Sequence, residues 1–378
     1  MKRRMIPLIT ALLLLCCLSS AAGETFFFIS DTHMKSTGES LSASAAALAA
    51  VTAHARGRDT LLLLGDTTDN GLPEEHALTC ERAETLAQDT GARVLLIPGN
   101  HDYNAHFGPE DYAAQYAVFG LADAFSRDSA TASCAVRTPG GAVLLLLDTN
   151  LFDARDSGHV LPNGGFTAET LAWAESVLAG LPRSEKTPVI VCGHHPILPR
   201  SRDERTPGAA ALADLLRRHG VTLYLCGHDH GFATVEEDGL RQITVGQPQA
   251  YPGWAGVLTV EDGAMAWRTE TIYDTEDPVF RLMRASTETL AASMATGTLA
   301  PTIHAGDEEA VAWYVRVFMR HASGEMTPEF CAEMLSDDQP GCRKWREIET
   351  RTVVKDWIFS LLEHCPESVK EIEVEGRK

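Results

Sequence analysis

The stretch TLLLLGDTTD, residues 60–69, joins an uninterrupted apolar run to a glycine and an aspartate. The apolar run predicts a β-strand. Polar side chains that follow such a strand lie at the carboxyl edge of a sheet, where open α/β folds bind their ligands. The glycine lets the backbone turn sharply and approach a bound group. This stretch therefore predicts an α/β fold with a ligand site at one sheet edge.

Four further stretches have the same form, with an apolar run that leads into a polar block. Three of these four blocks also begin with glycine. The blocks are DTH at 31–33, GNHD at 99–102, GHH at 193–195 and GHDH at 227–230. All five blocks contain Asp, Asn or His, whose side chains bind metal ions. Together they predict a hydrolytic centre with two metal ions.

The order of apolar patterns predicts an α/β fold with four layers, α/β/β/α, in which two packed mixed sheets are covered by helices. Strand-like and helical patterns alternate from Thr25 to about His219, and short strands with turns follow from Val221 to Thr271. The turns EEDG and VEDG predict hairpins, because glycine supplies the positive φ that they require. The expected helices are Leu41–His54, Glu74–Gln88, Ala168–Leu178 and Ala209–Arg218.

The chain divides by pattern into three parts, at 1–22, 23–275 and 276–378. Residues 279–378 contain no convincing strand and predict a helical appendage that serves as a lid or a packing module. Its expected helices are Pro278–Ala292, Glu308–His321 and Lys344–His364. The last ten or so residues are highly charged and are expected to fray.

The first 22 residues predict an export signal. Basic residues at 2–4 precede an apolar stretch at 6–18, and small residues at 20–22 offer a cleavage site. We therefore expect a secreted, periplasmic or cell-surface protein, with an anchor formed by an uncleaved signal as the alternative. No later segment is long and apolar enough to predict a membrane span.

The formal net charge of −20 disfavours nucleic acid as a partner, because nucleic-acid binding depends on Lys and Arg. A small phosphorylated substrate remains compatible with this charge, since bound cations dominate the local field. The oligomeric state is left open. Cys331, Cys342 and Cys365 could pair in an oxidising compartment, and the sequence does not decide their connectivity.

The types of side chain in the predicted site also restrict which metals it would bind. Asp31 and His33 are two residues apart, so an extended backbone points both side chains the same way, and His228 and His230 form a similar pair. The single carboxylate of Asp66 has two oxygens, which suits it to bridge two ions. Asn100 adds an amide oxygen and His194 an imidazole. This mixed set favours Mn, Fe, Zn or Co over Mg or Ca.

The five blocks, in this order, resemble the calcineurin-like metallophosphoesterase superfamily over residues 25–272. The resemblance implies that Asp31, His33 and His230 hold one ion and that Asn100, His194 and His228 hold the other, with Asp66 bridging both. It also implies that His101 contacts the phosphate and protonates the leaving group, and that Asp102 orients His101. A water between the ions is the expected nucleophile.

Further sequence features indicate which branch of the superfamily the chain resembles. The segment at 164–178, with GHHP after it, is similar to the branch that contains cyclic-nucleotide phosphodiesterases and other hydrolases of small esters. The purple acid phosphatase branch has a tyrosine where Asp69 stands. His195 could face the substrate or support the structure. Gln247, Tyr251 and Trp254 could line the pocket or pack within a turn.

These features predict an exported phosphoesterase with two metal ions that hydrolyses a small phosphodiester or phosphomonoester. The alternative is a surface binding or scaffold protein on a degenerate phosphoesterase fold. The complete set of seven ligands argues against that alternative, because a site without chemistry has no physical need to keep all of them. The natural substrate and the native metals are left open.

Overall fold

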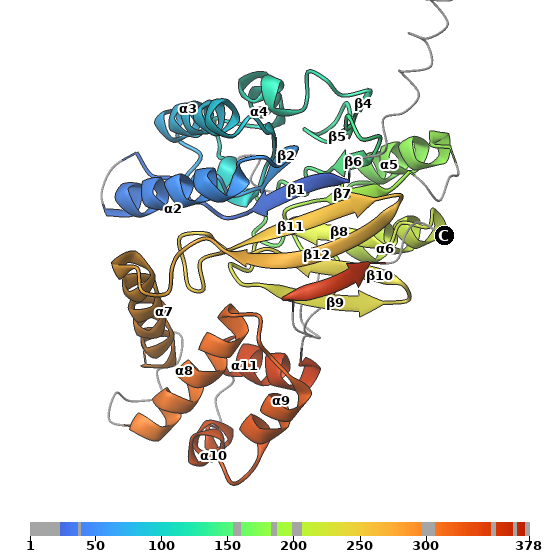
Figure 1. The fold of residues 1–378 in the computed structure, drawn as a ribbon. Coiled ribbons are helices and arrows are strands. Elements are labelled where there is room, and N and C mark those ends of the chain that lie inside the picture. Colours follow the sequence, from blue (N-terminus) through green and yellow to red (C-terminus); the bar gives the residue numbers. More distant parts are fainter. Residues whose placement is uncertain are drawn as a thin grey trace, which may run out of the picture.

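The computed structural model describes residues 23–36, 39–153, 160–182, 187–198, 206–296, 307–348, 353–365 and 369–374. The predicted signal at 1–22 lies outside these residues. Of the helices that are described, none is both long and apolar enough to cross a membrane. Two sheets form the centre of the molecule, and a group of helices lies at one end of it (Figure 1).

The first sheet has the strand order β13-β12-β11-β1-β2-β3, and the second has the order β4-β5-β6-β7-β8-β10-β9. Both sheets are mixed: β1, β2 and β3 are parallel to one another, as are β6, β7, β8 and β10. The first sheet comprises β1 (Glu24–Ile29), β2 (Thr60–Leu64), β3 (Arg93–Ile97), β11 (Trp254–Glu261), β12 (Ala264–Thr271) and β13 (Glu371–Val374). The second comprises β4 (Ser126–Arg127), β5 (Cys134–Arg137), β6 (Val143–Leu146), β7 (Val189–Cys192), β8 (Leu223–Cys226), β9 (Ala233–Glu237) and β10 (Leu240–Thr244).

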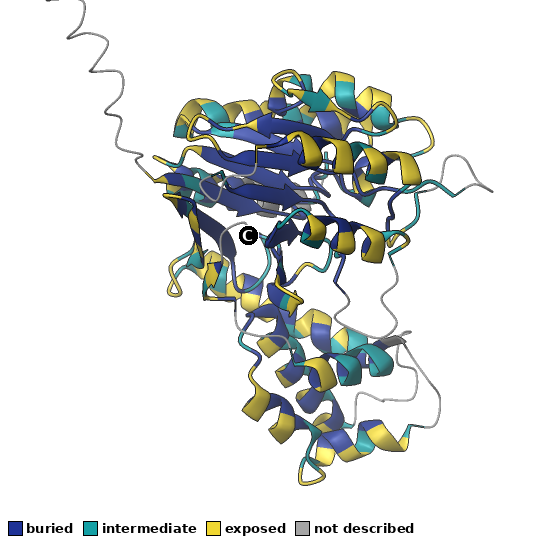
Figure 2. Ribbon diagram, turned by 90° about the vertical axis from the view of Figure 1, so that its right-hand side faces the viewer, coloured by how far each residue is buried: buried dark blue, intermediate teal, exposed yellow. Residues whose placement is uncertain are grey.

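Alternate residues of one strand face two different cores, because successive side chains point to opposite faces of a sheet. Phe26 and Phe28 of β1 belong to the core between the two sheets. Phe27 and Ile29 pack instead with helices α2 (Glu39–Ala55) and α3 (Pro73–Thr90). A third core lies between the second sheet and helices α5 (Ala168–Gly180) and α6 (Ala209–Arg218). The predicted four-layer α/β/β/α sandwich is therefore confirmed, and Figure 2 shows its buried strands beneath half-exposed helices.

The helices begin and end close to the predicted positions. The layers are formed by α2 (Glu39–Ala55), α3 (Pro73–Thr90), α5 (Ala168–Gly180) and α6 (Ala209–Arg218), with the short α4 (Pro109–Gln115) beside α3. Both predicted hairpins have a two-residue turn, Asp238–Gly239 and Asp262–Gly263, with positive φ at both positions. Asp-Gly favours this turn because both residues tolerate the left-handed conformation.

The C-terminal helices have a core of their own, which includes Trp313, Tyr314 and Trp345. They are α7 (Pro278–Thr296), α8 (Glu308–Ala322), α9 (Pro328–Leu335), α10 (Pro340–Glu347) and α11 (Val353–His364). Two described helices, α10 and α11, occupy most of the stretch predicted as one helix at 344–364. The sequence pattern did not reveal α9, which is only eight residues long.

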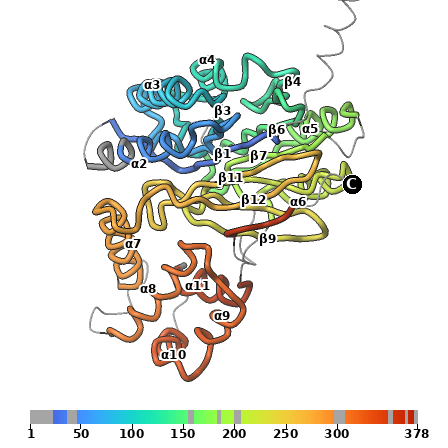
Figure 3. Tube along the Cα trace, in the orientation of Figure 1, coloured from blue at the N-terminus to red at the C-terminus, as the bar shows by residue number. Residues whose placement is uncertain are grey.

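The last residues that the structure describes correct the prediction that the chain frays at its end. Instead of fraying, residues 371–374 form β13, which pairs antiparallel with β12 at the edge of the first sheet. Figure 3 follows the chain from the helices back to this sheet. Val369 is fully buried in the core between the sheets, and its carbonyl accepts a hydrogen bond from Trp267 Nε1 at 3.1 Å. The prediction that no strand follows residue 279 is therefore wrong.

This return of the chain predicts that the last residues stabilise the whole α/β domain. We expect Val369→Ala to lower the free energy of unfolding by about 2 kcal/mol, because two buried methyl groups are lost and a small cavity remains. Val118→Ala is the matched control, since Val118 is 69% exposed. Chemical denaturation of both variants measures the difference, and equal stabilities would contradict the placement of Val369.

Candidate metal centre

The five predicted blocks each follow a strand directly, three in the first sheet and two in the second. DTH follows β1, GDTTD follows β2 and GNHD follows β3, while GHH follows β7 and GHDH follows β8. Within each sheet these strands are parallel neighbours, so their carboxyl ends lie at one edge. The candidate centre is formed where these edges of the two sheets meet.

The turns that carry the predicted ligands have an uncommon backbone conformation. Five of the seven predicted ligands have positive φ: Asp31 (55°), His33 (41°), Asp66 (48°), His228 (72°) and His230 (58°). In the described part of the chain, only three other residues besides glycine have positive φ, namely Asp238, Asp262 and Cys365. Such conformations cost energy and cluster at functional sites. The backbone therefore indicates that these side chains are held for a purpose other than folding.

Two glycines permit the turns to pack against one another. A Cβ atom on Gly99 would lie 2.3 Å from Asp66 Oδ1, and one on Gly65 would lie 2.6 Å from His194 Nδ1. Neither distance is possible for a real side chain. This close approach explains why a glycine precedes the polar residue in these blocks.

One group of candidate ligands contains Asp31, His33, Asp66 and His230. One ligand atom from each of the four lies within 4.8 Å of the other three. The Nε2 atoms of His33 and His230 face each other at 3.1 Å. Asp31 Oδ1 is 3.5 Å from His230 Nε2, and Asp66 Oδ2 is 3.8 Å from His33 Nε2.

The second group lies on the other side of Asp66. Asp66 Oδ2 is 3.2 Å from His194 Nε2, and the ring centre of His194 is 5.3 Å from that of His228. His194 Nδ1 must donate its proton to the Leu64 carbonyl, 2.8 Å away, because a carbonyl can only accept. This bond directs Nε2 towards the site. Asp66 thus lies between a histidine of each group.

Several buried polar atoms here have no hydrogen-bond partner, although buried polar atoms normally have one. They include Asp31 Oδ1 and Asn100 Oδ1. Both are atoms that coordinate divalent cations. The residues present therefore fit a two-metal centre, to which Asn100 offers an unpaired amide oxygen.

The protonation of the histidines suits metal binding. Burial, partly opposed by the Asp66 carboxylate, lowers the pKa of His33 to about 3. Burial and the adjacent His194 lower the pKa of His228 to about 4. Both rings are neutral at pH 7 and keep a lone pair. Burial also disfavours the charged form of His194, but the Asp66 carboxylate outweighs this effect and raises the pKa of His194 to about 10. His194 therefore carries an extra proton at pH 7, and metal binding must release it.

The structure corrects the predicted partner of His101. Its Nδ1 donates to the backbone carbonyl of Asp69 at 2.6 Å, and its ring lies 4.7 Å from the His33 ring. Asp102 is fully buried and does not orient this ring. The Asp102 carboxylate instead accepts hydrogen bonds from Thr67, Thr68 and Gly99. Asp102 therefore holds the turn that carries Asp66 against the turn that carries Asn100.

Of the two roles left open for His195, facing the substrate or supporting the structure, the contacts of its ring favour the second. His195 Nε2 donates to the Pro162 carbonyl at 3.1 Å, and Nδ1 accepts from the Thr149 hydroxyl at 2.7 Å. The side chain is fully buried, and burial lowers its pKa well below the usual range. Both ring nitrogens are occupied, so His195 supports the GHH turn. Thr149 is a supporting residue that the sequence motifs did not reveal.

A family profile described as "Calcineurin-like phosphoesterase" matches residues 24–232, which is more than half of the chain. The chain belongs to the calcineurin-like phosphoesterase family. It is therefore a hydrolase that acts on phosphoester bonds, as the resemblance of the five blocks implied. All seven predicted ligands lie within the matched residues.

Relatives of this phosphoesterase include phosphodiesterases. A protein named glycerophosphodiester phosphodiesterase GpdQ, from Enterobacter lignolyticus, is 28% identical over 229 residues, covering 57% of this chain and 73% of its own length. A probable cyclic nucleotide phosphodiesterase from Rhodococcus erythropolis is 27% identical over 263 residues, covering 65% of this chain and 79% of its own. Purple acid phosphatase PPD1 from yellow lupin seeds shares the fold, with a TM-score of 0.50 at 12% identity over 67% of this chain and 52% of that one.

The loop at 247–253 contributes a supporting residue that no sequence motif reveals. Gln249 Nε2 donates to the carbonyls of Asp31 and Thr32 at 2.7 and 3.1 Å, so the loop braces the first ligand turn. Trp254, in contrast, is buried at the start of β11 and packs against Phe232. Of the two readings left open for Trp254, the structure supports packing.

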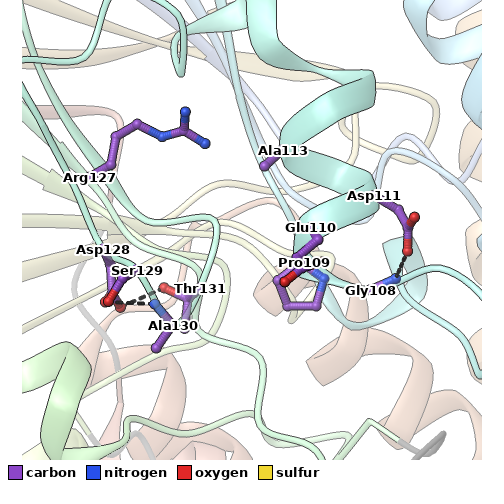
Figure 4. A pocket seen from close by; sticks show the side chains of 10 residues that line it. All are labelled: Gly108, Pro109, Glu110, Asp111, Ala113, Arg127, Asp128, Ser129, Ala130 and Thr131. Carbon is purple, nitrogen blue, oxygen red and sulfur yellow. Dashed lines mark hydrogen bonds between the residues drawn. The ribbon is translucent and has the colours of Figure 1, made fainter.

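A separate hollow of about 700 Å³ lies between the start of α4 and the loop that follows β4 (Figure 4). Two of its acidic side chains are bonded within their own loops: Asp111 accepts from Gly108 N, and Asp128 accepts from Ala130 N and Thr131 Oγ1. None of the predicted ligands lines it. This hollow is therefore distinct from the candidate metal centre.

The position of Asp66 between the two groups predicts the effect of its loss on metal content. We expect the isolated wild-type protein to hold about two ions per chain and Asp66→Asn to hold fewer than His33→Asn, because Asp66 contacts both groups. Asp238→Asn, in a hairpin turn, is the matched control. Elemental analysis of the dialysed proteins measures the ions, and an Asp66→Asn variant with wild-type metal content would contradict the bridging position.

Proposed function

We propose that this chain is an exported phosphodiesterase that uses two divalent ions to hydrolyse a small phosphodiester, with a phosphomonoester as the alternative substrate. Asp31, His33, Asp66 and His230 would hold one ion, and Asp66, Asn100, His194 and His228 the other. The proposal rests on the position of Asp66 Oδ2, which lies between His33 Nε2 and His194 Nε2. The phosphodiesterase names of the relatives favour a diester.

Two ions bound here would supply positive charge to the phosphoryl oxygens and lower the pKa of a bound water. The protein's own contribution to leaving-group chemistry is His101. Because Nδ1 is committed to the Asp69 carbonyl, Nε2 is the nitrogen that donates a proton to the departing oxygen. The exposed ring beside His33 is accessible to a substrate. The Asp69 carbonyl thus performs the orienting role that the motif assigned to Asp102.

The activity is tested with the metal-loaded protein and bis(4-nitrophenyl) phosphate. Hydrolysis should occur, should stop after dialysis against a chelator and should return when Mn²⁺ or Zn²⁺ is added. Full activity in excess chelator would contradict the metal centre. Tight metal binding without hydrolysis of any phosphodiester or phosphomonoester would favour the degenerate scaffold instead.

Export is tested by mass spectrometry, which should find a mature start near Gly23 in the extracytoplasmic fraction.

The role of His101 predicts a dependence on the leaving group. His101→Ala should reduce hydrolysis of an alkyl phosphodiester by about 100-fold and that of a nitrophenyl diester by much less, because nitrophenolate departs without a proton. His106→Ala is the matched control, since His106 is an exposed histidine five residues further along the chain. An equal loss on both substrates would show that His101 binds phosphate and does not protonate the leaving group.

A further inference from the structure

A cavity of about 450 Å³ lies between the loop at 247–253 and helices α7 and α8. Tyr251 lines it from the loop, and arginines line it from both helices. Its charged lining residues are Arg284, Glu288, Arg316, Arg320 and Glu325. The lining thus has three guanidinium groups and two carboxylates, and a third carboxylate, that of Glu333, pairs with Arg316 from outside the lining.

Two contacts connect the walls of this cavity to the candidate metal centre. Gln249, two residues before Tyr251, binds the Asp31 and Thr32 carbonyls. In α8, the residue after the lining residue Arg320 is His321, whose ring packs against Gly231, where a Cβ atom would lie 3.3 Å from His321 Nε2. Gly231 directly follows His230. The cavity is thus bounded by segments that also brace two of the ligand turns.

The arginines are held in place by aromatic rings. The Arg284 guanidinium lies 5.8 Å from the centre of the Tyr251 ring. Arg316 and Arg320 lie 5.5 and 5.3 Å from the centre of the Phe330 ring. Stacking of this kind fixes a guanidinium in place before a ligand arrives, which lowers the entropic cost of binding.

Each arginine also keeps hydrogen-bond donors for a ligand. Arg284, Arg316 and Arg320 form ion pairs at 3.1, 3.0 and 3.0 Å, each with a single glutamate. A guanidinium has five N–H donors, and one carboxylate occupies at most two of them. The side chains of all three are about half exposed. The remaining donors are therefore available to an anion.

We propose that this cavity binds an anionic group, such as a carboxylate, on the part of the substrate that lies beyond the scissile phosphate. The inference rests on the proposed phosphodiesterase function and adds a substrate class to it: small phosphodiesters with a second negative charge. The arginines act in binding and take no part in the cleavage step.

The test compares sn-glycero-3-phosphoserine with sn-glycero-3-phosphoethanolamine, which differ by one carboxylate, as substrates of the metal-loaded full chain. Wild-type protein should have a kcat/KM about tenfold higher for the serine compound, since a hydrogen bond to a charged group contributes at least that factor. Arg284→Gln and Arg316→Gln should each reduce this preference, mainly by raising KM for the serine compound. Arg281→Gln, also on α7 but outside the cavity, is the matched control for loss of charge.

The outcomes separate this inference from the proposed function. Equal kcat/KM for the two compounds, or a preference that Arg284→Gln and Arg316→Gln leave unchanged, would overturn the cavity assignment while hydrolysis itself continues. A preference that Arg281→Gln reduces equally would also overturn it, because the effect would then come from overall charge. If the metal-loaded protein cleaves neither compound but cleaves bis(4-nitrophenyl) phosphate, the cavity assignment alone fails. If it cleaves none of the three, the phosphodiesterase function fails.

Discussion

The contact of Asp66 Oδ2 with His33 Nε2 on one side and His194 Nε2 on the other joins the two halves of the centre. His33 comes from the first sheet and His194 from the second, so this carboxylate fixes how the two sheet edges meet. A buried carboxylate is costly unless it is paired, and burial alone would raise its pKa. His194 and His33 outweigh that effect and hold the pKa of Asp66 below its usual range.

The rest of the fold supports this arrangement. Positive φ at five predicted ligands costs conformational energy, which the continuous cores on both faces of each sheet offset. Backbone carbonyls orient the rings: Leu64 fixes His194, and Asp69 fixes His101. The buried Asp102 ties the second and third ligand turns together. Rigid strands and short hydrogen-bonded turns thus prepare the geometry before any ion binds.

The sequence predicted the structural features that depend on local residue patterns. Uniform apolar runs identified the strands, and the polar residues after them identified the ligands, because a strand end fixes where its next side chain lies. Contacts between distant segments were not predictable in this way. The role of Asp102 depends on Thr67 and Thr68, the role of His195 depends on Thr149, and no spacing in the sequence reveals either pair. The strand at 371–374 was missed because half of its residues are charged, as befits an edge strand.

The C-terminal region packs against the α/β domain at two places. Val369 and β13 return to the first sheet, and His321 packs on the turn that carries His230. These contacts indicate that the C-terminal region contributes to the stability of the α/β domain and to the surroundings of the candidate metal centre.

A crystal structure of the metal-loaded protein with anomalous diffraction from Zn or Mn tests directly whether Asp66 bridges two ions. We expect two anomalous peaks about 3.5–4 Å apart, with Asp66 between them, Asn100 and His194 on one ion, and His195 and Asp102 on neither. A single peak, or two peaks that Asp66 does not bridge, would contradict this expectation.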